Sequence, residues 1–237
     1  MTVAIRRRLA AIDWDAARAS LDAEGFARLP PLLTPSECAG VSALFEEDGR
    51  FRSTIEMARH GYGEGRYRYF AEPLPPIVRE LRAQAYPHLV PVANAWAAAL
   101  RQETRFPPDL DAFRGLCRRR GQEKPTPLLL RYGPGGYNAL HRDLYGDLAF
   151  PLQLAVFLSR PGVDYAGGAF LLVAQRPRRQ SRGEALVPGQ GEGVVFATSE
   201  RPVASARGLS RGAMRHGVAT VTRGRRDTLG IIFHDAK

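Results

Sequence analysis

The chain has 237 residues with an ordinary hydrophobic fraction of 44%, and its two cysteines, Cys38 and Cys117, exclude a disulfide framework. The formal net charge of +10 favours polyanionic partners such as nucleic acid, although a coding bias toward arginine explains it equally well. The longest apolar stretches, such as residues 152–158, are too short to span a bilayer, and no signal-peptide pattern is present. We therefore expect one cytoplasmic domain over residues 1–237, without membrane contact.

Helical patterns dominate the first half of the chain. Residues 13–24 carry apolar side chains at helical spacing, and Gly25 follows as a stop signal. The run Thr34-Pro35-Ser36-Glu37 is a capping box that predicts a second helix through about residue 47. Residues 77–101 predict a further helical region, interrupted or bent at its two internal prolines. Residues 1–125 are therefore expected to be mainly helical.

The second half of the chain changes to short apolar runs separated by glycine, proline and polar clusters. Many short strands at such intervals predict a sandwich or a barrel over residues 126–237. The predicted strands are residues 128–132, 139–144, 152–158, 169–173, 193–197, 217–221 and 228–233.

Two histidines and an aspartate form the most informative motif in the chain. Residues two apart in a strand share a face, so His141 and Asp143 can reach one ion while Arg142 points away. A distal histidine, His216, completes the set typical of non-haem Fe(II) oxygenases. Arg226 follows ten residues later, across an apparent turn, and a guanidinium there can bind the distal carboxylate of an acidic cosubstrate.

The remaining histidines offer weaker alternatives. His234 is a second candidate for the distal ligand, but no arginine follows it in the chain. His60 and His88 lie in the helical half, where we expect them to pack or to face solvent.

The order His-x-Asp, distal His and nearby Arg resembles the motif of the 2-oxoglutarate- and Fe(II)-dependent dioxygenases. The segments 131–136 (RYGPGG) and 167–170 (GGAF) are similar to stretches of the prolyl-hydroxylase-like members, although Ala169 stands where those relatives commonly have an acidic residue. The resemblance implies an α+β fold in which a double-stranded β-helix, or jelly roll, is covered by N-terminal helices.

A more specific resemblance, to a bacterial oxygenase family labelled as nucleic-acid-targeting, extends over nearly the whole chain. It is carried by short segments from both halves of the sequence. These are residues 51–53 (FRS), 66–70 (RYRYF), 73–75 (PLP), 214–217 (MRHG) and 232–236 (IFHDA).

The resemblance to the dioxygenases implies that His141, Asp143 and His216 ligate Fe(II). It implies that Arg226, or the adjacent Arg225, pairs with the C5 carboxylate of 2-oxoglutarate. Tyr132 matches a tyrosine that contacts 2-oxoglutarate in prolyl-hydroxylase-like enzymes, although a core aromatic on a strand is an equally good interpretation. With O2, such an enzyme couples decarboxylation of 2-oxoglutarate to succinate with C–H hydroxylation or oxidative demethylation.

The substrate is open at this point among three interpretations. Arginine clusters could form a basic surface at the mouth of the site, and the Tyr-Arg run at 66–70 is compatible with stacking on exposed bases, although an ordinary half-buried strand explains it better. The rivals of a nucleic-acid oxygenase are a protein or amino-acid hydroxylase and a non-catalytic basic module that binds nucleic acid. The clusters are Arg118 to Arg120, then Arg176, Arg178, Arg179 and Arg182, then Arg207, Arg211 and Arg215.

Overall fold

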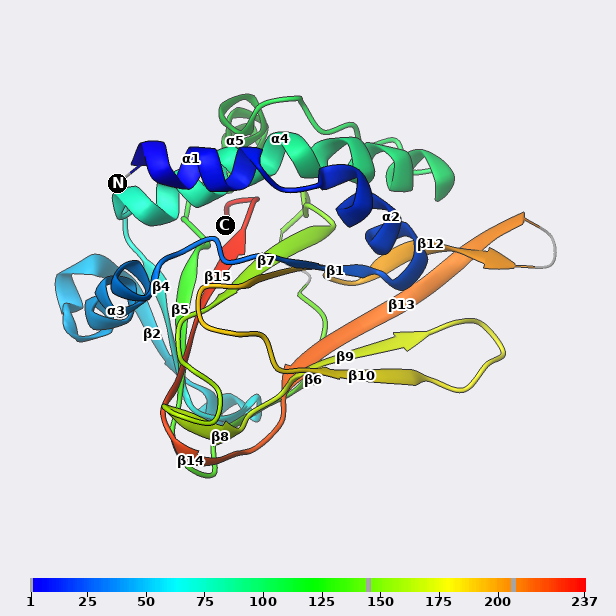
Figure 1. Cartoon of the computed structure of the whole chain (residues 1–237). Coiled ribbons are helices and arrows are strands. Elements are labelled where there is room, and N and C mark those ends of the chain that lie inside the picture. Colours follow the sequence, from blue (N-terminus) through cyan, green and yellow to red (C-terminus); the bar gives the residue numbers. More distant parts are fainter. Residues whose placement is uncertain (1, 144–145, 206–207) are drawn as a thin grey trace.

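The computed structural model describes residues 2–143, 146–205 and 208–237. Its helices gather on one side of two large antiparallel sheets (Figure 1). The longer helices are α1 (Thr2–Ala10), α2 (Trp14–Glu24), α3 (Pro35–Ala43), α4 (Pro76–Ala99) and α5 (Leu110–Arg119). Short 3-10 helices follow α3 at Leu44–Glu46, Asp48–Arg50 and Met57–His60.

The helix boundaries follow from local capping. The Asp13 side chain accepts a hydrogen bond from the Ala16 amide at 2.9 Å, and Gly25, with φ 84°, ends α2. The predicted capping box of Thr34 and Glu37 is present at the start of α3, which passes into a 3-10 turn at Leu44, slightly before the predicted end.

The helix α4 continues through Pro87 and Pro91, so of the predicted interruption or bend the interruption is absent. Both prolines are exposed, and they are four residues apart on one face of the helix. The carbonyl groups that lose an amide partner there can bind water instead, which makes the prolines tolerable.

One sheet has seven strands and forms the layer under the helices. In spatial order they are β1 (Phe26–Leu29), β11 (Gly193–Ala197), β7 (Leu152–Phe157), β15 (Arg226–Ile232), β5 (Leu128–Tyr132), β4 (Arg66–Phe70) and β2 (Phe51–Glu56).

The second sheet faces the first and has six strands. Its order is β10 (Arg182–Leu186), β9 (Phe170–Gln175), β13 (Gly208–Val218), β6 (Tyr137–His141) and β3 (Gly63–Glu64), with β12 (Glu200–Ser205) also paired to β13. A small ribbon of β14 (Val221–Gly224) and β8 (Tyr165–Gly167) lies near one end of the molecule (Figure 1).

Alternate residues of strand β15 face the helices on one side of the sheet and a cavity on the other. Leu229 and Ile231 are completely buried on the face that α3 and α4 cover. The alternate residues Arg226, Thr228 and Gly230 line a cavity on the other face. The strand is buried on both faces, which fits the apolar residues of its second half, whereas its first three residues are polar and are buried near the cavity end of the strand.

The predicted strands are largely confirmed, although several bounds differ and β8, β10 and β12 were not predicted. The strand predicted at 139–144 ends at His141, and Leu144 lies outside the described residues. The strand predicted at 217–221 is divided between the end of β13 and the start of β14. The mainly helical part also supplies β1 to β4, of which the sequence had indicated only β4, as the half-buried strand of the Tyr-Arg run.

None of the helices in the described parts of the chain combines the length and the apolar character needed to cross a membrane.

Candidate metal centre and its cavity

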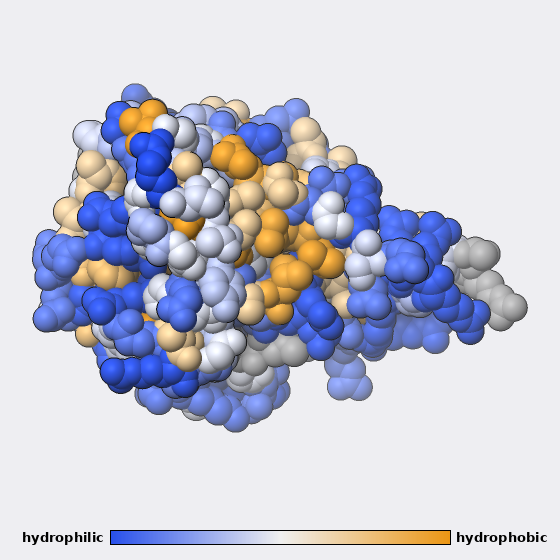
Figure 2. Space-filling model, turned by 90° about the horizontal axis from the view of Figure 1, so that it is seen from below, coloured by the Kyte–Doolittle hydropathy of each residue, from blue (hydrophilic) through white to orange (hydrophobic). Residues whose placement is uncertain are grey.

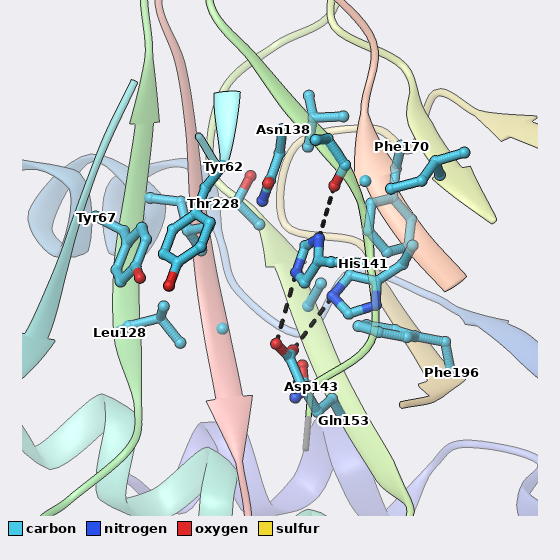
Figure 3. A pocket seen from close by; sticks show the side chains of 18 of the residues that line it. Tyr62, Tyr67, Leu128, Asn138, His141, Asp143, Gln153, Phe170, Phe196 and Thr228 are labelled. Atoms are coloured by element: carbon cyan, nitrogen blue, oxygen red, sulfur yellow. Dashed lines mark hydrogen bonds and ion pairs between the residues drawn. The ribbon is translucent and has the colours of Figure 1, made fainter. Parts of the chain in front are cut away.

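A cavity of about 390 Å³ lies between the two sheets. Strands of the seven-stranded sheet supply Tyr67, Leu128 and Thr228 to one wall, and His141 and Phe170 of the other sheet stand opposite (Figure 3). The walls are mostly apolar and aromatic with a few polar groups, the composition usual for small-molecule sites.

The structure brings together the three predicted metal ligands. His141 of β6 and His216 of β13 are direct partners across neighbouring antiparallel strands, with ring centroids 4.2 Å apart. Asp143 lies just beyond the end of β6, not within a strand as predicted, and Arg142 between them is exposed at the cavity rim. One ligand atom from each of the three residues lies within 4.8 Å of the others.

The carboxylate of Asp143 faces both imidazoles. Its Oδ1 is 3.5 Å from Nε2 of His141, and its Oδ2 is 3.3 Å from Nε2 of His216. Two ligand atoms at right angles, each about 2.1 Å from a transition-metal ion, are about 3 Å apart. The observed spacings are close to that value, so the three side chains fit a divalent metal ion of this class.

Neighbouring groups hold these ligands in the form that a metal requires. The backbone carbonyl of Ala139 accepts a hydrogen bond from Nδ1 of His141 at 2.7 Å, which leaves the lone pair of Nε2 for a metal (Figure 3). Burial, followed by the charge of His216, lowers the pKa of His141 and favours the neutral ring. His216 packs against Phe196, with ring centroids 4.7 Å apart.

Asp143 is held as a carboxylate despite its burial. Burial alone would raise its pKa, but the charges of His216 and His141 and hydrogen bonds from His216 and Gln153 lower the pKa overall. The Gln153 amide donates to Oδ2 of Asp143 at 2.7 Å. The site therefore presents one carboxylate and two imidazole rings to an ion.

Arg226 is buried in the same cavity without a carboxylate partner among the described residues. Its Nη1 donates to the hydroxyl of Thr228 at 2.7 Å, whereas its Nε has no hydrogen-bond partner among the described residues. The rings of Phe157 and Tyr132 lie 5.3 and 5.6 Å from the guanidinium carbon. A buried cation that faces a cavity in this way requires an anionic ligand.

The second of the paired glycines, Gly168, makes room for this arginine. Gly168 has φ 61°, and a side chain there would place its Cβ 2.9 Å from Cδ of Arg226. The segment that resembles prolyl-hydroxylase-like enzymes thus has a local steric role beside the candidate anion site.

Tyr132 is fully buried at the cavity and lies near Arg226. Burial raises the pKa of its hydroxyl to about 12, so the hydroxyl stays protonated and can donate a hydrogen bond. The amide of Asn138 donates to this hydroxyl at 3.4 Å. A carboxylate beside Arg226 would have a second donor within the same wall.

Arg225 points to the outside of the sheet. Its side chain is 61% exposed and forms an ion pair with Asp227 at 3.4 Å. It does not line the cavity that contains the three candidate ligands. Of the two arginines that the sequence left open, only Arg226 faces the candidate metal centre.

The other histidines lie apart from this cluster. Nδ1 of His234 accepts a hydrogen bond from the amide of Phe150 at 3.1 Å, and His234 does not line the cavity. His88 stacks on Trp14 with ring centroids 4.4 Å apart, and the exposed His60 stacks on Tyr62.

Sequence reasoning missed Gln153 and Thr228, which contact the candidate ligand Asp143 and Arg226. Each carried a detectable signal. Gln153 is a polar residue inside an otherwise apolar strand, where a buried amide needs a partner. Thr228 is two residues from Arg226 and therefore shares its face of the strand.

The arginine clusters do not all gather at the cavity mouth. Arg118 to Arg120 end α5 in the helical layer, whereas the other two clusters lie on hairpins of the six-stranded sheet (Figure 1). Arg207 lies outside the described residues. A single basic surface that includes Arg118 to Arg120 is therefore not formed around the site.

Comparison with known proteins adds a family and relatives. A family model described as an oxygenase catalysing oxidative methylation of damaged DNA, Oxygenase-NA, matches residues 65–236. In Mycobacterium tuberculosis strains CDC 1551 and H37Rv, an uncharacterised protein is 48% identical over 167 residues. The match covers 70% of this chain and 72% of the relative.

Similar solved structures include a Pseudomonas putida prolyl-4-hydroxylase, with TM-score 0.54 and 15% identity over 94% of this chain and 100% of that one. A 2OG-Fe(II) oxygenase from Burkholderia pseudomallei also has TM-score 0.54 and 15% identity, over 94% of this chain and 91% of that one. A prolyl hydroxylase from Trichoplax adhaerens, solved with a hypoxia inducible factor peptide, has TM-score 0.54 and 13% identity over 99% and 94% of the two chains. These structures share the fold of the present chain.

Proposed function

The chain belongs to the Oxygenase-NA family, and from this membership we propose that it oxidises modified nucleic acid with Fe(II) bound by His141, Asp143 and His216. Arg226 then binds the distal carboxylate of 2-oxoglutarate. Bound Fe(II), 2-oxoglutarate and O2 supply the oxidising chemistry, which releases succinate and CO2 and converts a substrate C–H bond to C–OH. Where that carbon is a methyl group on nitrogen, loss of formaldehyde completes a demethylation.

One observation carries this proposal: a buried arginine that forms no ion pair with a described residue shares a cavity with two histidines and a carboxylate. The metal ligands alone would suit several divalent ions and several chemistries. Arg226 adds a requirement for an anionic ligand, and a dicarboxylate can reach a metal with one end and a guanidinium with the other.

The residues around the centre position the reactants and limit access of water. Tyr132 donates to the carboxylate that Arg226 binds, and Thr228 fixes the guanidinium by accepting from Nη1. Gln153 holds the Asp143 carboxylate toward the ion. Tyr67 and Leu128 form the wall opposite His141, where a substrate group would be enclosed (Figure 3).

Nucleic acid is the favoured substrate because the family description names damaged DNA and the chain carries a net charge of +10. A protein or amino acid is the second candidate, because two of the similar structures are prolyl hydroxylases. Membership of an enzyme family favours catalysis over the third interpretation, a binding module without activity.

We also propose that residues 1–237 act as one domain. Strand β1 pairs with β11, and β4 pairs with β5, so the mainly helical part completes the sheet that bears Arg226. The cytoplasmic location stays a prediction.

The adjacent arginines provide a matched test of the cosubstrate site. We expect Arg226→Gln to raise the 2-oxoglutarate concentration needed for half-maximal succinate release at least about 100-fold, because a charge-assisted pair in a buried site is lost. Arg225→Gln removes the same charge from the outer face and should change this requirement less than about twofold. An equal 2-oxoglutarate requirement in the two variants would contradict the role of Arg226.

A further inference from the structure

Two hairpins of the six-stranded sheet project from the body of the molecule. They are β9 with β10, and β12 with β13, and together we call them the arm (Figure 1). The arm is continuous with the candidate metal centre. Strand β13 carries His216, and Leu172 of β9 is the direct partner of His216 across the two strands. Seen from below, the projecting part is hydrophilic and stands beside an apolar area of the body (Figure 2).

The arm carries positive charge that the rest of the described chain does not neutralise. Arg182 pairs with Glu184 at 2.8 Å, and Arg211 pairs with Glu200 at 2.7 Å. Apart from the buried Arg201, four further described arginines of the arm form no ion pair with a described residue. These are Arg176, Arg178, Arg179 and Arg215.

The sequence at the turn of the first hairpin makes this imbalance local. Residues 174–183 contain four arginines and no acidic residue, and Arg178, Arg179 and Arg182 among them are exposed. Within the arm, the buried Arg201 of β12 donates to the carbonyls of Asp22 and Ala23, not to a carboxylate. Exposed guanidinium groups without counter-ions attract a polyanion and release its counterions on binding.

We propose that the arm is a nucleic-acid-binding surface that holds the phosphate backbone beside the nucleotide in the cavity. This inference rests on the proposed function, and it assigns residues to a contact that the metal centre does not supply. Arginine suits the role because its planar donors match phosphate oxygens in two-point geometry. Phosphate contacts fix position along the strand and do not read sequence.

The dimensions of the strands set the distance between the cavity and these contacts. Arg176 is four residues beyond Leu172, the partner of His216, which corresponds to about 13 Å at about 3.3 Å per residue. One strand of a DNA duplex advances about 3.4 Å per nucleotide. The arginines are therefore expected to meet phosphates from about four nucleotides away from the nucleotide being oxidised.

The test compares two triple variants that remove the same charge. In the first, Arg176, Arg178 and Arg179 of the arm are replaced by glutamine. The matched control replaces the consecutive residues Arg118, Arg119 and Arg120. They are exposed and, like the three arm residues, form no ion pair with a described residue, but they lie at the end of α5. Binding of single-stranded and duplex DNA of about 20 nucleotides is measured over a range of salt, without iron or 2-oxoglutarate.

We expect the arm variant to lose about two to three units of the slope of log affinity against log salt, and at least about tenfold in affinity at about 0.1 M salt. The α5 variant should keep the wild-type slope. If the triple arm variant unfolds, the single variant Arg178→Gln at the turn should still lower the slope by about one. Equal losses in the arm and α5 variants, or an unchanged arm variant, would overturn the proposal.

A trinucleotide probe tests the expected reach. It is too short to extend from the cavity to Arg176, so the arm variant should bind it as the wild type does. An equally large loss of affinity for the trinucleotide would overturn the proposal.

The test also separates the arm from the proposed function. Because binding is measured without iron, the expected loss of DNA affinity in the arm variant, in a protein that releases no succinate, contradicts the proposed function alone. A normal Fe(II) and 2-oxoglutarate response without an arm effect contradicts the arm alone.

Discussion

A buried arginine is found at each end of β15, and the two arginines differ in the partners that neutralise their charge. Past the carboxyl end, Arg82 donates to the carbonyls of Ile232 and Phe233 and to Asp235 at 2.7 to 2.9 Å. At the amino end, Arg226 is buried to a similar degree, and its side chain has the hydroxyls of Thr228 and Tyr165 as partners but no carboxylate among the described residues. The first charge is neutralised by the fold, and the second is left for a ligand.

This difference separates a structural charge from a functional one. Asp235 receives a second partner, Arg114, at 2.9 Å, so a network closes the carboxyl end against α4 and α5. No corresponding carboxylate faces Arg226 within the described chain, and its opposite side is a cavity. A buried charge is evidence for a ligand only when its surroundings leave it unneutralised beside free space.

The largest expected loss of stability comes from removing the carboxylate that neutralises Arg82. Asp235→Asn leaves Arg82 buried without its carboxylate, and such a loss typically costs about 3 to 5 kcal/mol. We expect the free energy of unfolding, measured by denaturant titration, to fall by that amount. A loss below about 1 kcal/mol would show that the backbone carbonyls alone neutralise Arg82.

His234, at the same end, should produce a smaller effect that depends on pH. Burial, followed by the charge of Arg82, lowers its pKa to about 4 from an ordinary value of 6.5. Between these values the unfolded chain binds the proton and the folded chain does not, so stability is complete above pH 6.5 and falls as the pH is lowered toward 4. The decrease for a group of this kind is about 3 kcal/mol.

The His234→Asn variant isolates this contribution, because its side-chain oxygen can still accept from the Phe150 amide. The wild-type and variant stability curves should differ in slope only between about pH 6.5 and 4. Parallel curves through that window would mean that His234 is protonated in the folded protein as readily as in the unfolded chain.

At the open end of β15, removal of the charge should cost little stability. Arg226→Met replaces an unneutralised buried cation by an apolar side chain, so we expect the free energy of unfolding to stay equal or to rise. With Fe(II) present, 2-oxoglutarate at about 100 times its dissociation constant should stabilise the wild type by about 2.7 kcal/mol. The variant should not respond, and a variant that does respond would place the cosubstrate elsewhere.

The sequence predicted those parts of the structure whose signals are local. The family match and the solved structures confirm the predicted dioxygenase class and the helix-covered jelly roll. Strands β5 and β11 have the predicted bounds because each is a dense apolar run between turn residues. The cluster of His141, Asp143 and His216 follows from spacing and from the scarcity of histidine in the chain.

What the sequence did not predict depends on distant partners. Strand β1 has four residues and exists as an edge strand because β11 offers it a partner about 170 positions away. Strand β10 and the outer half of β13 are polar and lack an apolar pattern, since both belong to the projecting arm. The choice of Arg226 over Arg225 depended on the register of β15, which a one-residue slip would have reversed.

The most direct test of the central claim is an anaerobic titration of the Fe(II)-loaded protein with 2-oxoglutarate, followed by the weak visible charge-transfer absorption of the chelate. We predict the band in the wild type and in the control variant Asp147→Ala, whose carboxylate pairs with Lys237 on the surface, and its loss in Asp143→Ala. An undiminished band in Asp143→Ala, or no band in the wild type, would contradict the assignment of the metal centre.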